Sequence, residues 1–200
     1  PSILTSSLWV SSSSQYADHM QAYAAGIAEG YTGALQIDQW HVNFQDEVFG
    51  DKPPTTGLIH YFSRQIMWSL TLAEHVYTDG GKHADSLTKQ FRAQALKSLI
   101  NTEALDMTHI AQQARSILMS AKETQFWRQV YLMFLQVGGV NAGYTMQSGV
   151  NHYQPLDFLQ MYMLNSAGDL EDLAGLFPDT EKRDESIPWT PIVYTEKPLD

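Results

Sequence analysis

Apolar side chains recur every three or four positions through most of this 200-residue chain, and this spacing limits the fold more than any other feature. The clearest stretch is 16–35, where one apolar stripe returns on every turn. Such a stripe is typical of a helix that buries one face. Further helices are predicted at 40–49, at 59–77, at 85–122 with a break near 101–102, at 124–147, and from Pro155 onward. The sequence therefore indicates a helix-dominated chain.

Glycine, proline and polar residues separate these helices. They cluster at 50–54 and 79–81, where loops are predicted. Short strands are predicted only at 3–10 and 192–194. Two hundred residues suit one domain or a large part of one, so we expect residues 1–200 to form a single unit, the N-terminal fragment of one larger domain.

Small residues are concentrated in the first predicted helix, at Ala24, Ala25, Gly26 and Gly30. A helix surface without large side chains allows another segment to approach its backbone. We therefore expect close packing against this stretch.

Composition excludes several classes of function. The formal net charge is −10, which disfavours nucleic-acid binding because phosphate contacts need a basic surface. The chain has no cysteine, so it has neither disulfides nor thiolate metal sites. No apolar run approaches the ~20 residues that span a bilayer. The seven histidines lack metal-ligand spacing, and no metal or cofactor is expected.

A short acidic run at 165–173 joins two segments with helical spacing. Gly168 stands between them, where a chain reversal or tight backbone packing is expected. Asp169 and Asp172 then fall in the first turn of the next helix, where carboxylates favour the positive helix end. Catalytic carboxylates or a cation site are alternatives, but helix capping and packing explain the run with fewer assumptions.

Three blocks of sequence together resemble the phospholipase B-like proteins. The blocks are residues 22–31 with Trp40 and Asn43, residues 126–130 with Gln136 and Gly139, and residues 164–173 closing at 177–178. Within the third block, Ser166, Gly168, Asp169 and Asp172 form the structural signature. The blocks occur in the family's order over most of residues 16–178.

The resemblance implies an N-terminal nucleophile hydrolase that is made as one precursor and cut in two. The implied fold is α+β, with this chain as the helix-rich N-terminal part of an αββα sandwich whose strands come mostly from a second chain. The implied nucleophile is the first residue of that second chain, a cysteine, so no catalytic residue is assigned here. We expect 179–200 to be an exposed linker that leads to a processing site at or near Asp200.

The resemblance further implies hydrolysis of ester or amide bonds to acyl groups, with lipids as substrates and a lysosomal or secreted location. Trp40, His41 and Asn43 are the candidates for lining a substrate pocket. The alternative is a buried tryptophan beside a hydrogen-bonded asparagine.

Two other hypotheses explain a chain without a nucleophile. One is a non-catalytic helical module that binds a partner, and the other is a catalytically inactive relative with the same fold. An isolated helical bundle should fold alone, whereas half of a sandwich should not. Cooperative unfolding of residues 1–200 would therefore favour the module.

Overall fold

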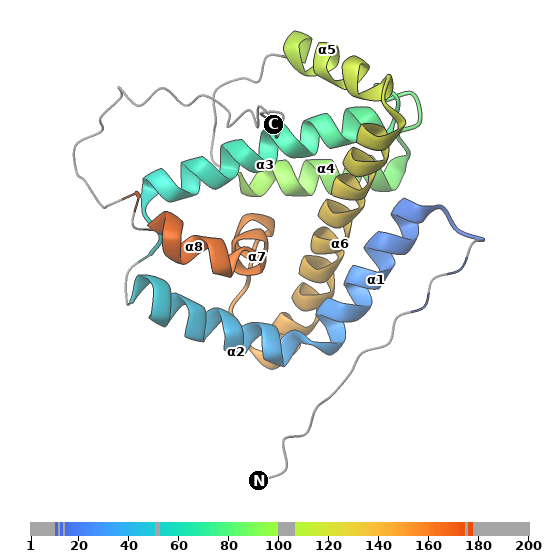
Figure 1. The fold of residues 1–200 in the computed structure, drawn as a ribbon. Coiled ribbons are helices and arrows are strands. Elements are labelled where there is room, and N and C mark those ends of the chain that lie inside the picture. The colour runs from blue at the N-terminus through green and yellow to red at the C-terminus, as the bar shows by residue number, and fades with distance from the viewer. Residues whose placement is uncertain are drawn as a thin grey trace.

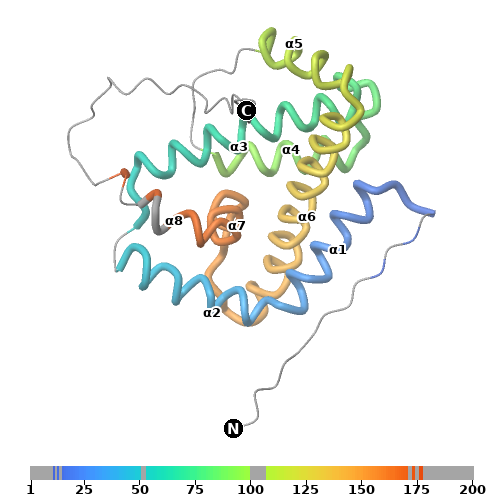
Figure 2. The backbone as a smooth tube through the Cα atoms, in the orientation of Figure 1, coloured from blue at the N-terminus to red at the C-terminus, as the bar shows by residue number. Residues whose placement is uncertain are grey.

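The computed structural model describes residues 11, 13, 15–50, 53–99, 107–174 and 176–177. Its elements are α1 (Asp18–Thr32), α2 (Ala34–Phe44), the π-helix η1 (Gln45–Phe49), α3 (Thr56–Tyr77), α4 (Ser86–Ser98), α5 (Met107–Leu118), α6 (Ala121–Asn151), α7 (Phe158–Asn165) and α8 (Ala167–Ala174) (Figure 1). The long helix α6 passes beside α1, and α7 contacts α3, α4 and α6 (Figure 2).

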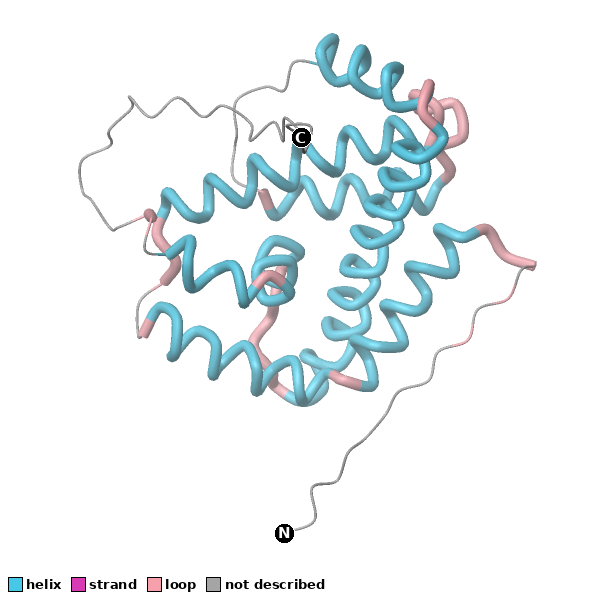
Figure 3. The backbone as a smooth tube through the Cα atoms, viewed as in Figure 1, coloured by secondary structure: helices cyan, strands magenta, loops and turns pink. Residues whose placement is uncertain are grey.

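The α+β sandwich predicted from the family resemblance is wrong for the part of the chain that the structure describes. Every element there is a helix, and the connections are loops and turns (Figure 3). The physical reason is the 3–4 spacing, which places apolar side chains on helix faces that bury one another without a sheet. The two short strands predicted at 3–10 and 192–194 lie outside the described residues.

Several helices begin or end at residues whose side chains or backbone preferences favour a helix boundary. Side chains cap four helix N-termini: Thr55 for α3, Asp85 for α4, Ser120 for α6 and Asp157 for α7. The predicted loop at 79–81 is confirmed, because Asp79, Gly80 and Gly81 all have positive φ after the end of α3.

Aromatic side chains fill the space between α4, α6 and α7. The ring of Phe91 on α4 contacts the rings of Tyr131 and Phe158, with centroids 6.5 and 5.6 Å away. The ring of Phe134 stacks on that of Tyr162 at 5.6 Å. We call this set the aromatic core, and its large side chains hold α6 and α7 together.

The contact between α1 and α6 differs from the aromatic core, because the backbones of the two helices touch at glycine residues. A Cβ added to Gly26 would lie 2.1 Å from the carbonyl oxygen of Gln136, and one added to Gly30 would lie 2.0 Å from that of Val140. Gly139 and Gly143 of α6 lie equally close to the backbone of α1. A Cβ added to either residue would lie 2.1 or 2.2 Å from a carbonyl oxygen of α1. We call these four residues the glycine seam. The close packing predicted for the small residues of α1 is confirmed at Gly26 and Gly30. It is not found at Ala24 and Ala25, which line an open hollow on the other side of the helix.

Candidate functional site

The structure does not bring the three predicted pocket residues together. Trp40 is 51% exposed and Asn43 is exposed, so both face outward from α2. His41 is half-buried and lies toward α7. The alternative of a buried tryptophan is therefore wrong, and the role of all three residues in a pocket remains a prediction.

His41 lines a small cavity of about 50 Å³ between the α2–η1 segment and α7. Its other lining residues are Phe44, Gln45, Phe49, Pro54, Gln160, Met163 and Leu164. The Nδ1 atom of His41 is buried and has no hydrogen-bond partner among the described residues. Burial lowers the pKa of His41, and the nearby Asp38 carboxylate opposes this shift. The cavity suits a water molecule or a small polar group and is too small for an acyl chain.

A hydrogen-bonded anchor that the sequence analysis missed holds α2 in place beside this cavity. The hydroxyl of Tyr144 on α6 lies 3.1 Å from Oδ1 of Asp38 and 2.6 Å from the carbonyl oxygen of Gln154. The backbone N–H of Gln154 also donates to Asp38, at 3.2 Å. Burial and the bond to Asp38 raise the pKa of Tyr144, so its hydroxyl stays protonated. No local pattern marks this anchor, because Asp38 is more than a hundred positions away from both Tyr144 and Gln154.

The signature at 165–173 forms the junction between α7 and α8. Ser166 ends α7, and its hydroxyl donates to the carbonyl oxygen of Tyr162. Asp169 lies in the first turn of α8, as predicted. Gly168 continues helix α8, and no atom of the described residues lies within 4 Å of its Cβ position, so the predicted chain reversal or tight packing there is wrong for the part of the chain that the structure describes. The backbone of Asp172 is helical within α8.

Each of the three blocks of the resemblance contributes residues to packing contacts between helices. The first and second blocks meet at the glycine seam, where the side-chain amide of Gln136 also donates to Glu29 at 3.2 Å. The third block ends at Phe177, whose ring lies 3.3 Å from a Cβ placed on Gly57 and 5.4 Å from the ring of Tyr61. These residues therefore fix the positions of α1, α3 and α6.

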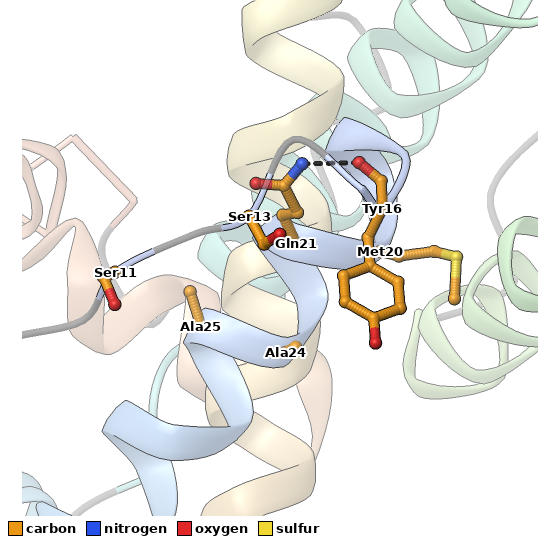
Figure 4. Close-up of a pocket in the computed structure, with 7 residues that line it drawn as sticks. All are labelled: Ser11, Ser13, Tyr16, Met20, Gln21, Ala24 and Ala25. Atoms are coloured by element: carbon orange, nitrogen blue, oxygen red, sulfur yellow. Dashed lines mark hydrogen bonds between the residues drawn. The ribbon is translucent and has the colours of Figure 1, made fainter.

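A larger hollow of about 420 Å³ lies on the outer side of α1 (Figure 4). It is lined by Ser11, Ser13, Tyr16, Met20, Gln21, Ala24 and Ala25. Tyr16 and Met20 are exposed, although the sequence places them on the apolar stripe of 16–35. One face of α1 is thus buried on α6, and the part of the chain that the structure describes leaves a second, apolar face of α1 exposed.

The processing candidate Asp200 and the predicted linker at 179–200 lie outside the described residues. Within the described ranges, no group of three or more histidine and carboxylate side chains is placed to hold a metal ion. None of the helices in those ranges combines the length and apolarity needed to cross a bilayer.

Comparisons with known proteins identify the family. A family model described as phospholipase B matches residues 5–197. Phospholipase B-like protein G of Dictyostelium discoideum is 24% identical over 168 residues, which is 83% of this chain and 20% of that protein. The chain thus spans about a fifth of the length of this curated relative. No solved structure matches. The chain belongs to the phospholipase B family.

Proposed function

We propose that this member of the phospholipase B family is one part of a hydrolase that cleaves ester or amide bonds to acyl groups, with lipids as the substrate class. The family match over residues 5–197 is the observation that carries the proposal. The relative in Dictyostelium supports it, since its name describes a phospholipase B-like protein and it is several times longer than the matched segment.

In this proposal the nucleophile is a cysteine at the start of a second chain cut from the same precursor. A thiolate attacks the acyl carbonyl, and the free α-amine of the same residue serves as its base. Backbone or side-chain donors must then stabilise the tetrahedral intermediate. The present chain contains no cysteine, so its own contribution is structural and substrate-binding.

The uncovered surface of α1 and α2 supports a contact with that second chain. It carries large apolar side chains that are about half exposed: Tyr31, Leu35, Trp40 and Val42. The proposal assigns these exposed side chains to the contact with the second chain, because large apolar area left in contact with water is typical of a protein interface or a ligand groove. Trp40 and Asn43 would then line a substrate pocket that the second chain completes.

A lysosomal or secreted location is part of the same proposal. The acidic composition is compatible with an acidic compartment, because carboxylates partly protonate at acid pH and the net charge of −10 then becomes smaller. The proposed location makes the pH response of the fold a property worth measuring.

A second candidate function is a non-catalytic helical module that binds a partner. It is favoured by the closed core, in which Leu58, Ile66 and Leu70 of α3 are fully buried within this chain alone. Such a core supports independent folding. A catalytically inactive relative is a third candidate, and it would lack a nucleophilic residue after the cut.

The deciding experiment is intact mass and N-terminal sequencing of the native protein. The proposal expects a second, larger fragment that co-purifies and begins with cysteine, and release of fatty acid from lipid or amide substrates. If the protein consists of this chain alone and unfolds cooperatively, the helical module is the correct function. A second fragment that begins with a residue other than Cys, Ser or Thr would identify the inactive relative.

A further inference from the structure

The turn between α5 and α6 carries the most exposed large apolar side chain among the described residues. Met119 in this turn is 89% exposed, and Phe126 in the second turn of α6 is 60% exposed. Leu118, the last residue of α5, is exposed as well. We call Leu118, Met119 and Phe126 the apolar tip. It lies where α5 meets the start of α6, and α6 runs from this corner to the opposite side of the molecule (Figure 1).

Hydrogen bonds hold the turn below the apolar tip in one shape. The carbonyl oxygen of Ile117 accepts from the backbone N–H of Ser120 and from the hydroxyl of Thr124, each at 2.9 Å. The backbone N–H of Met119 donates to the carbonyl oxygen of Ser116 at 3.1 Å. Because the backbone of this turn is hydrogen-bonded, Met119 is exposed by an ordered structure and not by a fraying helix end.

The exposure of Phe126 follows from the packing of the next residue. Trp127 is half-buried, and its ring packs on that of Trp68 in α3, with centroids 5.7 Å apart. The two rings lie against a small apolar cluster that α3 and α5 share. Successive residues of a helix point about 100° apart, so a Trp127 turned into this cluster leaves Phe126 facing away from it.

The charge around the apolar tip differs from that of the whole chain. Residues 107–130 contain three basic residues, Arg115, Lys122 and Arg128, and one acidic residue, Glu123. The whole chain has 12 basic and 22 acidic residues. Glu123 lies in the first turn of α6, where its carboxylate favours the positive helix end, and Arg128 lies over the Tyr77 ring.

Arg115 and Lys122 are the cations that flank the apolar tip. Both are exposed, and no ion pair among the described residues involves either of them. Their charges are therefore available to a partner that brings negative groups to this corner.

Apolar side chains that protrude beside cations fit a lipid surface better than a protein partner. A protein would need a pocket to receive each side chain, and protein interfaces are depleted in lysine. A lipid surface needs no pocket, because apolar side chains enter between the acyl chains while lysine and arginine remain at the level of the headgroups. Anionic lipids attract each lysine or arginine near the surface.

We propose that the α5–α6 corner docks the protein on an anionic lipid surface. Met119 and Phe126 enter the apolar layer, and Arg115 and Lys122 contact headgroup phosphates. The proposal rests on the proposed function, since a lipid substrate gives docking its use, but docking itself needs no catalysis. The α2 surface assigned to the second chain lies on the opposite side of the molecule from α5 and stays available (Figure 1).

The test is co-sedimentation of the native protein, with any second chain that it carries, with lipid vesicles. One set of vesicles is phosphatidylcholine alone, and the other contains about one-third phosphatidylserine. We expect tighter binding to the second set and a loss of this preference as the salt concentration rises, because salt screens the two cations. No binding to either set at low salt would overturn the proposal.

Lys122→Gln tests the charge at the corner. Binding to the vesicles with phosphatidylserine should weaken about fivefold, and binding to phosphatidylcholine alone should change little. Lys97→Gln, at an exposed lysine in the last turn of α4, removes the same charge elsewhere and is the control. Equal losses in the two variants would show that the net charge, and not this corner, determines binding.

Met119→Gln combined with Phe126→Gln tests the apolar tip. Binding to both sets of vesicles should weaken about tenfold or more. The control is Met146→Gln combined with Val150→Gln, because these side chains are 55% and 75% exposed at the other end of α6. Glutamine is a good helix former, so both pairs should keep the circular dichroism of the unaltered protein. Equal binding by the two pairs would overturn the proposal.

Hydrolysis separates this proposal from the proposed function. The apolar-tip pair should lose activity on vesicles and keep it on a short-chain lipid dissolved as monomers. If the native protein hydrolyses neither substrate, the proposed function is wrong, and vesicle binding still decides the docking. If the apolar-tip pair instead loses the second chain, the corner is a protein interface and the docking proposal is wrong.

Discussion

Gly138 and Gly139 are neighbours in α6, yet they belong to two differently built regions. A Cβ on Gly138 would lie 2.5 Å from the Phe91 ring in the aromatic core. A Cβ on Gly139 would lie 2.1 Å from the carbonyl oxygen of Tyr23 in the glycine seam. A ring can rotate or be replaced by a smaller side chain, whereas a helix backbone can only move as a whole.

The glycine seam positions two helices against each other, whereas the aromatic core fills the space between helices. In the glycine seam the backbones of α1 and α6 touch, so the seam fixes their separation and register. In the aromatic core the side chains set the spacing, so other combinations of similar volume should be accepted. Alanine substitutions along α6 should reveal this boundary between adjacent residues.

The largest effect is expected for Gly139→Ala. The added methyl meets the α1 backbone, and no side-chain rearrangement can relieve the clash. We expect a loss of about 3–5 kcal/mol in the free energy of unfolding, or detachment of α1, measured by urea denaturation and circular dichroism.

Gly149→Ala is the control in the same helix, because no atom of the described residues lies within 4 Å of its Cβ position. It should stabilise the protein by about 0.5–1 kcal/mol through higher helix propensity. If Gly139→Ala behaved like Gly149→Ala, the backbone contact at the seam would be disproved.

A smaller effect is expected for Gly138→Ala, about 1–3 kcal/mol, because its methyl meets the Phe91 side chain. Adding Phe91→Leu should recover part of this loss, since the smaller side chain makes room for the methyl. Urea denaturation of the two single variants and the double variant measures the coupling. Phe91→Leu should not recover any of the stability that Gly139→Ala loses. Equal recovery in the Gly138→Ala and Gly139→Ala backgrounds would contradict the proposed difference between the seam and the core.

His41 provides a test at the edge of the core, near α7. Burial lowers its pKa in the folded protein, so the unfolded chain binds a proton more readily. The stability linked to neutral His41 is therefore present above the ordinary histidine range and is lost as the pH falls through it. His41→Gln should flatten that acid loss in urea denaturation between pH 8 and 5, and an unchanged slope would refute it.

The sequence predicted the helices and part of the seam because both depend on local patterns. Apolar spacing placed α3, and the Asp79-Gly80-Gly81 turn that ends it was visible as a loop. Gly26 and Gly30 indicated a close approach, but their partner on α6 is more than a hundred residues away and leaves no local signal.

The incorrect predictions came from assigning a tertiary role to a local feature or to a resemblance. Gly168 was expected at a reversal, yet Ser166 forms the junction and Gly168 continues the helix. The sandwich fold was taken from the family, whereas the periodicity of the described segments already favoured an all-helical arrangement. The candidate pocket on α2 was found by residue type, and residue type does not reveal that Trp40 faces outward while His41 faces inward.

Trp40→Ala should have the smallest effect on stability and separates folding from function. The side chain is half exposed and outside both the seam and the core, so the free energy of unfolding should change by about 0.5 kcal/mol or less. Met133→Ala, at a comparably exposed apolar residue on α6, is the control. If the α1–α2 surface contacts a second chain or a lipid, only Trp40→Ala should reduce co-purification of that chain or substrate hydrolysis. Equal behaviour of the two variants would show that exposed apolar area, rather than this surface, determines binding.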